Sequence, residues 1–294
     1  MLKEINKNIY YEAIRKIKKD KLALTAFWII VIYIILAFLI QCKIVAFNYD
    51  KEVGLSYENP SFKHLFGTDI FGRDVFIRAI YAIKISMSVG LIASLIAIPI
   101  GVILGAIAGF FGKKVDEFIV WLYSTIASIP GLLLILAFSL VLKDKVIFGI
   151  QLKGIYTVYL AIGLTSWVGI CRLIRAEVMK HKKREYVLAA QALGASSWRQ
   201  IFIHILPNVF HLILIEFSLE FVYAIKSEVI ISYLGLGVQN LPSWGIMISD
   251  AKQELARGIW WQLAAASLFM FIIVLSLNIF IDALREAIDP KMKK

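Results

Sequence analysis

The chain has 294 residues, of which 60% are hydrophobic and 18% are charged. Soluble domains are usually about 45–50% apolar and about 25% charged, so this composition excludes an ordinary soluble protein and a disordered chain. The net charge of +11 suggests nucleic acid in a soluble protein, but membrane proteins also concentrate Lys and Arg in their cytoplasmic loops. The two cysteines, Cys42 and Cys171, are too few for a disulfide framework or a CxxC zinc site.

Long apolar stretches dominate the chain, and a membrane-spanning helix needs about 20 such residues. Five stretches carry no charge, and they are residues 22–42, 85–112, 118–142, 154–171 and 258–281. A sixth, residues 209–235, is apolar but contains Glu216, Glu220, Lys226 and Glu228, so we expect one side of it to face protein or water. The sequence therefore predicts an all-α membrane protein with six transmembrane helices.

The distribution of basic residues predicts the orientation of these helices. Twenty Lys and Arg residues lie in the two tails and in the loops after the second and fourth spans, against ten in the other three loops. This bias places both termini in the cytoplasm. The first span lacks a small-residue cleavage site behind it, so we expect it to stay uncleaved.

The first outer loop ends in a polar segment ahead of the second span. Thr68 or Asp69 is expected to cap a short helix, because short polar residues before apolar runs usually cap. The apolar residues Val75, Ile77, Ile80 and Tyr81 suggest that this helix lies along the membrane surface. A structural role is favoured here over contact with another protein.

The second span carries small residues at four-residue spacing, which are Ala93, Ala97, Gly101, Gly105 and Gly109. Such stripes allow close helix packing in lipid, and we expect packing within the chain rather than between subunits. Pro99 and Pro130-Gly131 interrupt the second and third spans. Such breaks line transport pathways or simply kink a helix, and the sequence leaves both open for Pro130.

Residues 167–208 form the most patterned cytoplasmic segment. Ala189, Ala190 and Ala192 favour a short helix, and Gly194 fits the left-handed residue that ends one. Ser196 and Ser197 are candidate caps of a second helix, and Pro207 fits the first turn of the next span. We expect a helix-turn-helix that serves as a docking surface. The alternative is an amphipathic helix at the membrane interface.

The acidic residues of the sixth stretch are the candidates for a translocation path. Glu216 and Glu220 are four residues apart and share a helix face, and Glu228 follows two turns later. Acids within spans either line a polar path or pair with a base, here Lys226, Lys84 or a partner subunit. The four histidines show no HxxxH or HExxH spacing, and GxSxG is absent, so zinc chemistry and hydrolysis are not indicated.

The loop at 184–208 resembles the "EAA" loop of ABC importer permeases. Ala189, Ala190, Gly194, Leu206 and Pro207 fall on that pattern in register. Leu188 and His204 depart from it, since the pattern has Glu and Ile there. The resemblance implies that Arg184, Glu185 and Tyr186, together with the five matching residues, couple the chain to an ATPase.

Three further motifs resemble the "C"-type permeases of the oligopeptide, dipeptide and nickel family. They are His64–Val75 (HLFGTDIFGRDV), Tyr233–Gln239 with Pro242–Gly245 (YLGLGVQ and PSWG), and Asp282–Pro290 (DALREAIDP). Asp69, Arg73 and Asp74 belong to the first of them. The resemblance implies a type I permease fold, with residues 1–83 forming the tail, first helix and outer loop, and residues 84–294 a five-helix core.

The same resemblance implies the partners and the function. These are a second permease, two ATPase subunits that hold the ATP and Mg, and an extracytoplasmic solute-binding protein, assembled in the bacterial cytoplasmic membrane. The chain has no GxxxxGK[ST] loop, so no cofactor and no enzyme activity are expected in it. Short peptides are the expected substrate, with nickel or a metal chelate as the alternative. An ion-coupled carrier is less favoured, because no internal repeat is visible.

Overall fold

The computed structural model describes residues 15–147, 149–237 and 241–288. Parts of the motifs, Val238-Gln239 and Asp289-Pro290, lie outside the described residues, as do residues 1–14 of the basic tail. The elements in chain order are α2 (Lys21–Gln41), α3 (Val75–Phe111), α4 (Lys113–Ala127), α5 (Gly131–Leu142), β1 (Val146–Ile147), β2 (Ile150–Gln151), α6 (Ile155–Gly163), α7 (Val168–His181), α8 (Glu185–Ala192), α9 (Ser197–Arg199), the π-helix η1 (Gln200–Ile205), α10 (Leu206–Tyr233), α11 (Trp244–Leu255) and α12 (Trp261–Ile288).

The prediction of a helical membrane protein is confirmed, apart from the two-residue strands β1 and β2, which form a small antiparallel hairpin. Within the described residues, five helices are long and apolar enough to cross a membrane, or six if α4 and α5 form one broken span. These two helices bend by 91° at a break that contains Pro130. The proline therefore ends one helix and precedes the next, whereas α3 continues through Pro99.

The chain divides into two compact units, and α3, α6 and α10 each contribute to both. The first unit contains residues 1–91, 143–158 and 222–294, and the second contains residues 92–142 and 159–221. The division between residues 83 and 84 that the sequence suggested stays a prediction.

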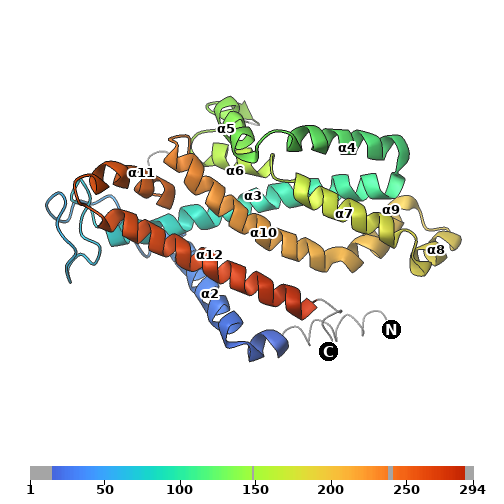
Figure 1. Cartoon of the computed structure of the whole chain (residues 1–294), viewed down its shortest axis with the longest axis horizontal. Helices are drawn as coiled ribbons and strands as arrows, with labels where there is room; N and C mark the ends of the chain where they lie inside the picture. The colour runs from blue at the N-terminus through green and yellow to red at the C-terminus, as the bar shows by residue number, and fades with distance from the viewer. Residues whose placement is uncertain (1–14, 148, 238–240, 289–294) are drawn as a thin grey trace. The chain divides into compact units, whose positions relative to one another are not determined.

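In the first unit, α2 and α12 lie side by side (Figure 1). The Tyr33 hydroxyl donates to the Phe269 carbonyl at 2.9 Å, and the rings of Phe27 and Phe280 lie 5.8 Å apart. Several apolar side chains of α2 nevertheless remain exposed, with Leu22 and Phe38 both about two-thirds accessible. Such apolar exposure fits a helix whose outer face meets lipid.

In the second unit, the small-residue stripe of α3 packs against α7. A Cβ atom at Gly101 would lie 2.6 Å from the Trp167 carbonyl oxygen, and one at Gly105 would lie 2.5 Å from that of Cys171. Ala97 on the same stripe is completely buried. The stripe therefore brings two backbones together within the chain, which confirms the intramolecular prediction.

Polar contacts supplement this packing at one point. The guanidinium of Arg175 on α7 donates two hydrogen bonds to the carboxylate of Asp116, in the first turn of α4. This two-pronged geometry is the strong form of an Arg–carboxylate pair. It fixes α4 against α7, which in turn packs against α3.

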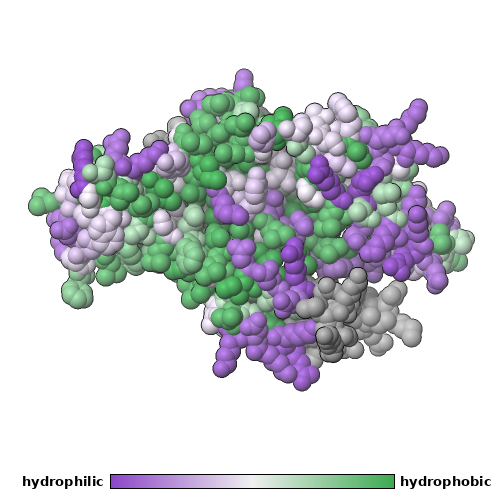
Figure 2. All heavy atoms as spheres, viewed as in Figure 1, coloured by the Kyte–Doolittle hydropathy of each residue, from purple (hydrophilic) through white to green (hydrophobic). Residues whose placement is uncertain are grey.

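Figure 2 shows that apolar residues cover much of the molecular face in view, while hydrophilic residues gather around α8. Wide apolar exposure of this kind is expected where lipid is the solvent. The hydrophilic area around α8 is consistent with a loop that lies outside the bilayer.

The glycine packing leads to a test with a matched control. Gly105→Ala adds one methyl group against the α7 backbone, and overpacking of this kind costs about 1–3 kcal/mol. We expect its melting temperature in detergent, followed by intrinsic fluorescence, to fall below that of the wild type. Gly169→Ala is the control, because no atom lies within 4 Å of a Cβ there. Equal shifts in the two variants would show that the contact is not tight.

Candidate functional site

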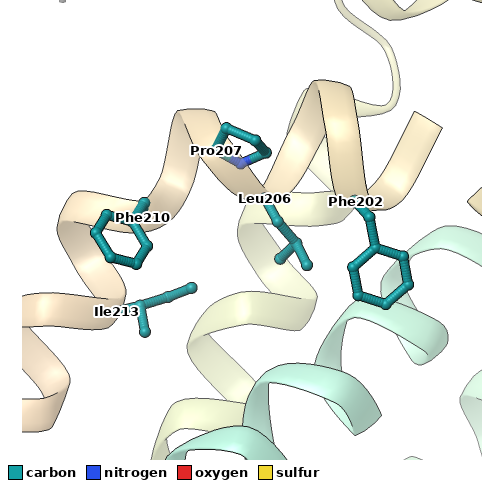
Figure 3. Close-up of a pocket in the computed structure, with 5 residues that line it drawn as sticks. All are labelled: Phe202, Leu206, Pro207, Phe210 and Ile213. Atoms are coloured by element: carbon teal, nitrogen blue, oxygen red, sulfur yellow. The ribbon is translucent and has the colours of Figure 1, made fainter. Parts of the chain in front are cut away.

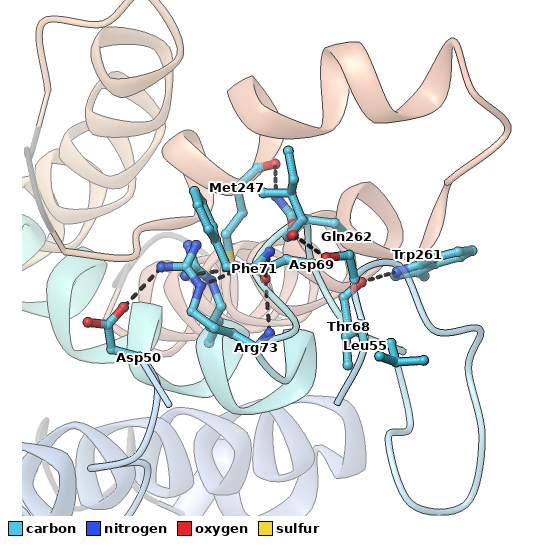
Figure 4. A network of polar contacts seen from close by, with 12 residues as sticks. Asp50, Leu55, Thr68, Asp69, Phe71, Arg73, Met247, Trp261 and Gln262 are labelled. Carbon is cyan, nitrogen blue, oxygen red and sulfur yellow. Dashed lines mark hydrogen bonds and ion pairs between the residues drawn. The ribbon is translucent and has the colours of Figure 1, made fainter. Parts of the chain in front are cut away.

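The polar segment before α3 is organised around the carboxylate of Asp69, which is 2% exposed. One oxygen accepts hydrogen bonds from the backbone N–H groups of Phe71 and Arg73, at 2.8 and 3.0 Å. The other pairs with the side chains of Arg73 at 2.8 Å and Arg78 at 3.3 Å. Arg73 also reaches Asp50 at 2.9 Å (Figure 4). Asp69 is therefore a structural hub rather than a helix cap.

Thr68 ties the same segment to α12. Its hydroxyl donates to the Leu55 carbonyl at 2.6 Å and accepts from the Glu58 N–H at 2.8 Å. Its carbonyl accepts from the indole N–H of Trp261 at 2.9 Å (Figure 4). Trp261 is consequently buried, with 5% of its surface exposed. The segment around Thr68 is thus fixed to the start of a helix 193 residues away.

The cap of α3 is Asp74, which corrects the expectation that Thr68 or Asp69 takes this role. Its carboxylate accepts from the N–H groups of Phe76 and Ile77, at 2.9 and 3.1 Å, and contacts Nδ1 of His64 at 2.7 Å. The expected surface helix is wrong as well. The residues that suggested it form the first turns of the long helix α3, and Val75 is completely buried.

A buried acid on α11, Glu254, was not anticipated from the sequence. Glu254 is 4% exposed, and its Oε2 atom has no hydrogen-bond partner among the described residues. Burial raises the pKa of Glu254 to about 7; the nearby Asp250 and Asp69 act in the same direction, and Arg78 and Arg257 oppose it. The signal available in the sequence was the spacing of Asp250 and Glu254 on one helix face, directly after the PSWG motif.

The pattern over residues 184–208 begins with the helix that was expected of it. Residues 184–208, called the coupling loop from here on, begin with Arg184 at the N-cap of α8. Gly194 has φ +82°, and the Ala195 N–H donates to the Ala190 carbonyl at 3.0 Å, which is the Schellman ending of a helix. The Ser196 hydroxyl then caps α9 by accepting from the Arg199 N–H. The predicted first helix and its ending at Gly194 are confirmed. The second helix is not a separate short one, because α9, η1 and α10 follow one another without a gap and form one candidate span, Ser197–Tyr233, that already contains Pro207.

The α8 helix has one buried and one exposed side. Val187 and Ala190 are buried, whereas Leu188 and Leu193 are 51% and 89% exposed. Glu185 and Ala189 are also exposed, and the hydroxyl of the half-buried Tyr186 lies 2.7 Å from Nδ1 of His181. One side of α8 is thus anchored in the chain, while the other presents exposed apolar side chains.

Leu206 and Pro207, the last residues of the pattern, lie where η1 passes into α10. They line an apolar groove of about 400 Å³ together with Phe202, Phe210 and Ile213 (Figure 3). Leu206 also packs against the apolar cluster that contains Val187. At this end of the pattern, Leu206 therefore contributes to packing, whereas Pro207 is exposed.

The acidic residues of α10 fall into two groups. Glu220 lies in the second unit, one turn after Glu216, and accepts a hydrogen bond from Ser166 at 2.5 Å. Ser166 lies in the break between α6 and α7, and its hydroxyl also contacts the Ile162 carbonyl at 2.8 Å. A carboxylate therefore lies beside an interruption in a candidate span.

Glu228 belongs to the first unit and is completely buried. Its oxygens accept from the hydroxyls of Ser232 at 2.7 Å and Ser86 at 3.5 Å. Among the described residues, no salt bridge joins it to Lys226, the pairing that the sequence suggested, and the Lys226 side chain is exposed. In this structure Glu228 is closed off from solvent.

No group of three or more His, Cys, Asp or Glu side chains arranged to hold a metal ion occurs within residues 15–147, 149–237 and 241–288.

Comparisons with known proteins agree with this arrangement. Residues 101–294 match the family described as "Binding-protein-dependent transport system inner membrane component". An oligopeptide transport system permease protein of Bacillus subtilis is 35% identical, over 98% of this chain and 91% of that protein. A dipeptide transport system permease protein of Bacillus subtilis is 34% identical, over 96% and 86%. A glutathione transport system permease protein of Pectobacterium atrosepticum is 31% identical, over 95% and 90%.

A solved structure shares the fold. The crystal structure of an amino acid ABC transporter with histidines matches with a TM-score of 0.53 and 17% identity. The match covers 70% of this chain and 91% of that one.

The buried carboxyl of Glu254 predicts a pH dependence of stability. Its pKa rises from the ordinary 4.5 in the unfolded chain to about 7 in the folded one, so the folded state binds the extra proton between these values. The contribution of this carboxyl to stability is therefore greatest below pH 4.5 and is lost as the pH rises to 7 and above. We expect the melting temperature to fall between pH 5 and pH 8, and Glu254→Gln to reduce that fall.

The exposed Glu52 of the same unit supplies the control. Glu52→Gln should leave the difference between the melting temperatures at pH 5 and pH 8 unchanged. An unchanged difference in Glu254→Gln as well would refute the assignment.

Proposed function

Because the chain belongs to the family of binding-protein-dependent transport system inner membrane components, we propose that it is the permease subunit of an ATP-driven importer of short peptides. The observation that carries this proposal is similarity over nearly the whole chain to permeases named for oligopeptides, dipeptides and glutathione. All three names denote peptides, which favours a peptide over nickel or a metal chelate.

The proposed complex contains a second permease, two ATPase subunits that carry the ATP and Mg, and an extracytoplasmic solute-binding protein. The chain itself contains no phosphate-binding loop of the GxxxxGK[ST] type, so the energy for transport comes from the ATPases. Both termini lie in the cytoplasm, as the excess of Lys and Arg on that side supports.

Uptake by reconstituted vesicles tests this function. Vesicles that hold the chain with its partner subunits should accumulate a labelled di- or tripeptide only when both ATP and the binding protein are supplied. Accumulation of nickel instead would favour the alternative substrate. Peptide uptake by the chain alone under an ion gradient, without ATP, would support a secondary carrier and overturn the proposal.

The coupling loop is proposed to bind one ATPase. Its docking residues are those that the pattern identified, namely Arg184, Glu185, Tyr186, Ala189, Ala190, Gly194, Leu206 and Pro207. The support is structural, since α8 is anchored through Val187 while Leu188 and Leu193 stay exposed. A helix held on one side and apolar on the other fits a groove on a partner protein.

The polar segment before α3, which contains Asp69, Arg73 and Asp74, is proposed to form the surface that contacts the solute-binding protein. Asp69, Arg73 and Asp74 do so by fixing the shape of the segment, because their side chains are engaged in internal contacts. This assignment keeps the structural role that the sequence favoured.

The translocation path is proposed to pass Glu216, Glu220 and the bend at Pro130. Glu220 lies beside the break between α6 and α7, and interrupted helices that line a pathway are common in transporters. Carboxylates at this place suit the ammonium group of a peptide. The role of Glu228 in this path stays a prediction, because the residue is completely buried in this structure.

Gly194→Val tests the docking. The residue needs φ +82°, and a non-glycine residue in such a conformation costs about 1–3 kcal/mol. We expect the variant to lose co-purification with the ATPase and ATP-dependent uptake. Gly194→Asn is the control, because Asn tolerates the left-handed conformation, and it should retain both. Docking through α8 is wrong if the valine variant behaves like the wild type.

The double variant Glu216→Gln and Glu220→Gln tests the path. It should assemble with the ATPases at the wild-type level and take up much less peptide, because the site for a cationic group is lost. Glu117→Gln, an exposed position on α4, should change neither quantity. Normal uptake by the double variant would assign both acids to helix packing.

A further inference from the structure

Lys182 links the coupling loop to a helix that is distant in sequence. It lies at the C-cap of α7, where its N–H donates to the Val178 carbonyl at 2.9 Å. Its side chain leaves this turn, and Nζ donates to the carbonyl of Phe110 on α3 at 2.6 Å. The same ammonium lies 4.9 Å from the centroid of the Phe110 ring. One cation therefore makes two contacts with one residue of α3.

The position of Phe110 explains why a cation is suited to it. The helix α3 ends at Phe111, so the Phe110 carbonyl belongs to its last turn, where carbonyls lack partners within the helix. The aligned peptide dipoles also place partial negative charge at this end. An ammonium group supplies the missing donor and the opposite charge, and hydrogen bonds to a charged group are the stronger kind.

The contact lies at the edge of a packed region, because Lys182 is exposed whereas Phe110 is buried. Gly109 on α3 approaches α7 so closely that a Cβ there would lie 2.5 Å from the Arg175 carbonyl oxygen. Phe110 and Val187 of α8 share one apolar cluster with Ile201 and Ile205. Apolar contacts permit sliding, because they are non-directional, whereas a hydrogen bond to a backbone carbonyl is directional. Lys182 thus adds a directional contact to an apolar one.

We propose that Lys182 is a positioning residue for energy coupling. Its ammonium group fixes the start of the coupling loop to the C-terminal end of α3, so that a displacement of α8 is passed directly to α3. This inference rests on the proposed docking of α8 to an ATPase. It adds the residue that transmits the movement and assigns Lys182 no contact with the ATPase itself.

The test compares Lys182→Met, Lys182→Arg and Lys183→Met in the complete complex. Methionine keeps an apolar stem of similar length and removes the cation, whereas arginine keeps both. Lys183→Met removes the same charge from the next residue, whose side chain is exposed. The quantities measured are the amount of co-purified ATPase, the rate of ATP hydrolysis, and the peptide molecules transported per ATP.

We expect Lys182→Met to retain ATPase binding and hydrolysis while transport per ATP falls by roughly 2- to 30-fold, the range for residues that carry coupling. Lys182→Arg and Lys183→Met should stay near the wild type. If Lys182→Met and Lys183→Met transport equally well, the proposal is refuted. If Lys182→Met loses the ATPase altogether, Lys182 belongs to the docking surface and the proposal is also refuted.

Hydrogen exchange supplies a second measurement that does not depend on transport. In Lys182→Met, exchange should accelerate in the last turn of α3 and in α8, and Lys183→Met should leave both segments protected. Unchanged exchange of both segments in Lys182→Met would show that the contact does not hold the loop. A wild-type complex that fails to bind an ATPase would instead refute the proposed function, whatever the exchange at these segments shows.

Discussion

The close approach of the α3 and α7 backbones is the constraint on which the second unit depends. Gly101, Gly105 and Gly109 contribute no side chains to this contact, and a single added carbon at any of them would overlap α7. In lipid, helices gain little from burying apolar surface, so van der Waals contact at short distance must hold them together. The direction of α7 follows from this contact, and the turn after α7 begins the coupling loop.

The polar segment before α3, in the first unit, is held in a different way. Here directional polar contacts dominate, with one buried carboxylate accepting from two backbone N–H groups and two arginines. Charge-assisted bonds of this kind are about twice as strong as neutral ones. The arrangement also buries the carboxyl of Glu254, whose pKa rises to about 7 as a result. Rigidity in this region therefore comes with sensitivity to protons.

Features with a local cause were predictable from the sequence. Hydropathy predicted the spans, four-residue spacing predicted the glycine contact, and an Ala-rich segment followed by Gly194 predicted α8 and its ending. Each of these depends on the backbone or on near neighbours. The family resemblance depended on four segments of the chain, and the comparisons confirmed it.

Features that depend on distant partners were not predictable. Thr68, Asp69 and Asp74 are all suitable caps. Only the structure shows that the side chains of the first two are engaged elsewhere, the Thr68 hydroxyl by Leu55 and Glu58. The pKa of Glu254 likewise depends on charged neighbours, Asp69 and Arg78, that lie far away in the sequence.

The π-helix η1 has a consequence for the alignment of helix faces. Leu206 donates its N–H to the carbonyl of Ile201, five residues earlier, so one residue is added without lengthening the helix by a full α-helical step. The side chains before Gln200 are therefore rotated about the helix axis relative to those after Ile205, by about the 100° that one α-helical residue occupies. Deleting one residue from η1 would turn the coupling loop away from its present phase with Glu216 and Glu220, although every other residue stayed in place.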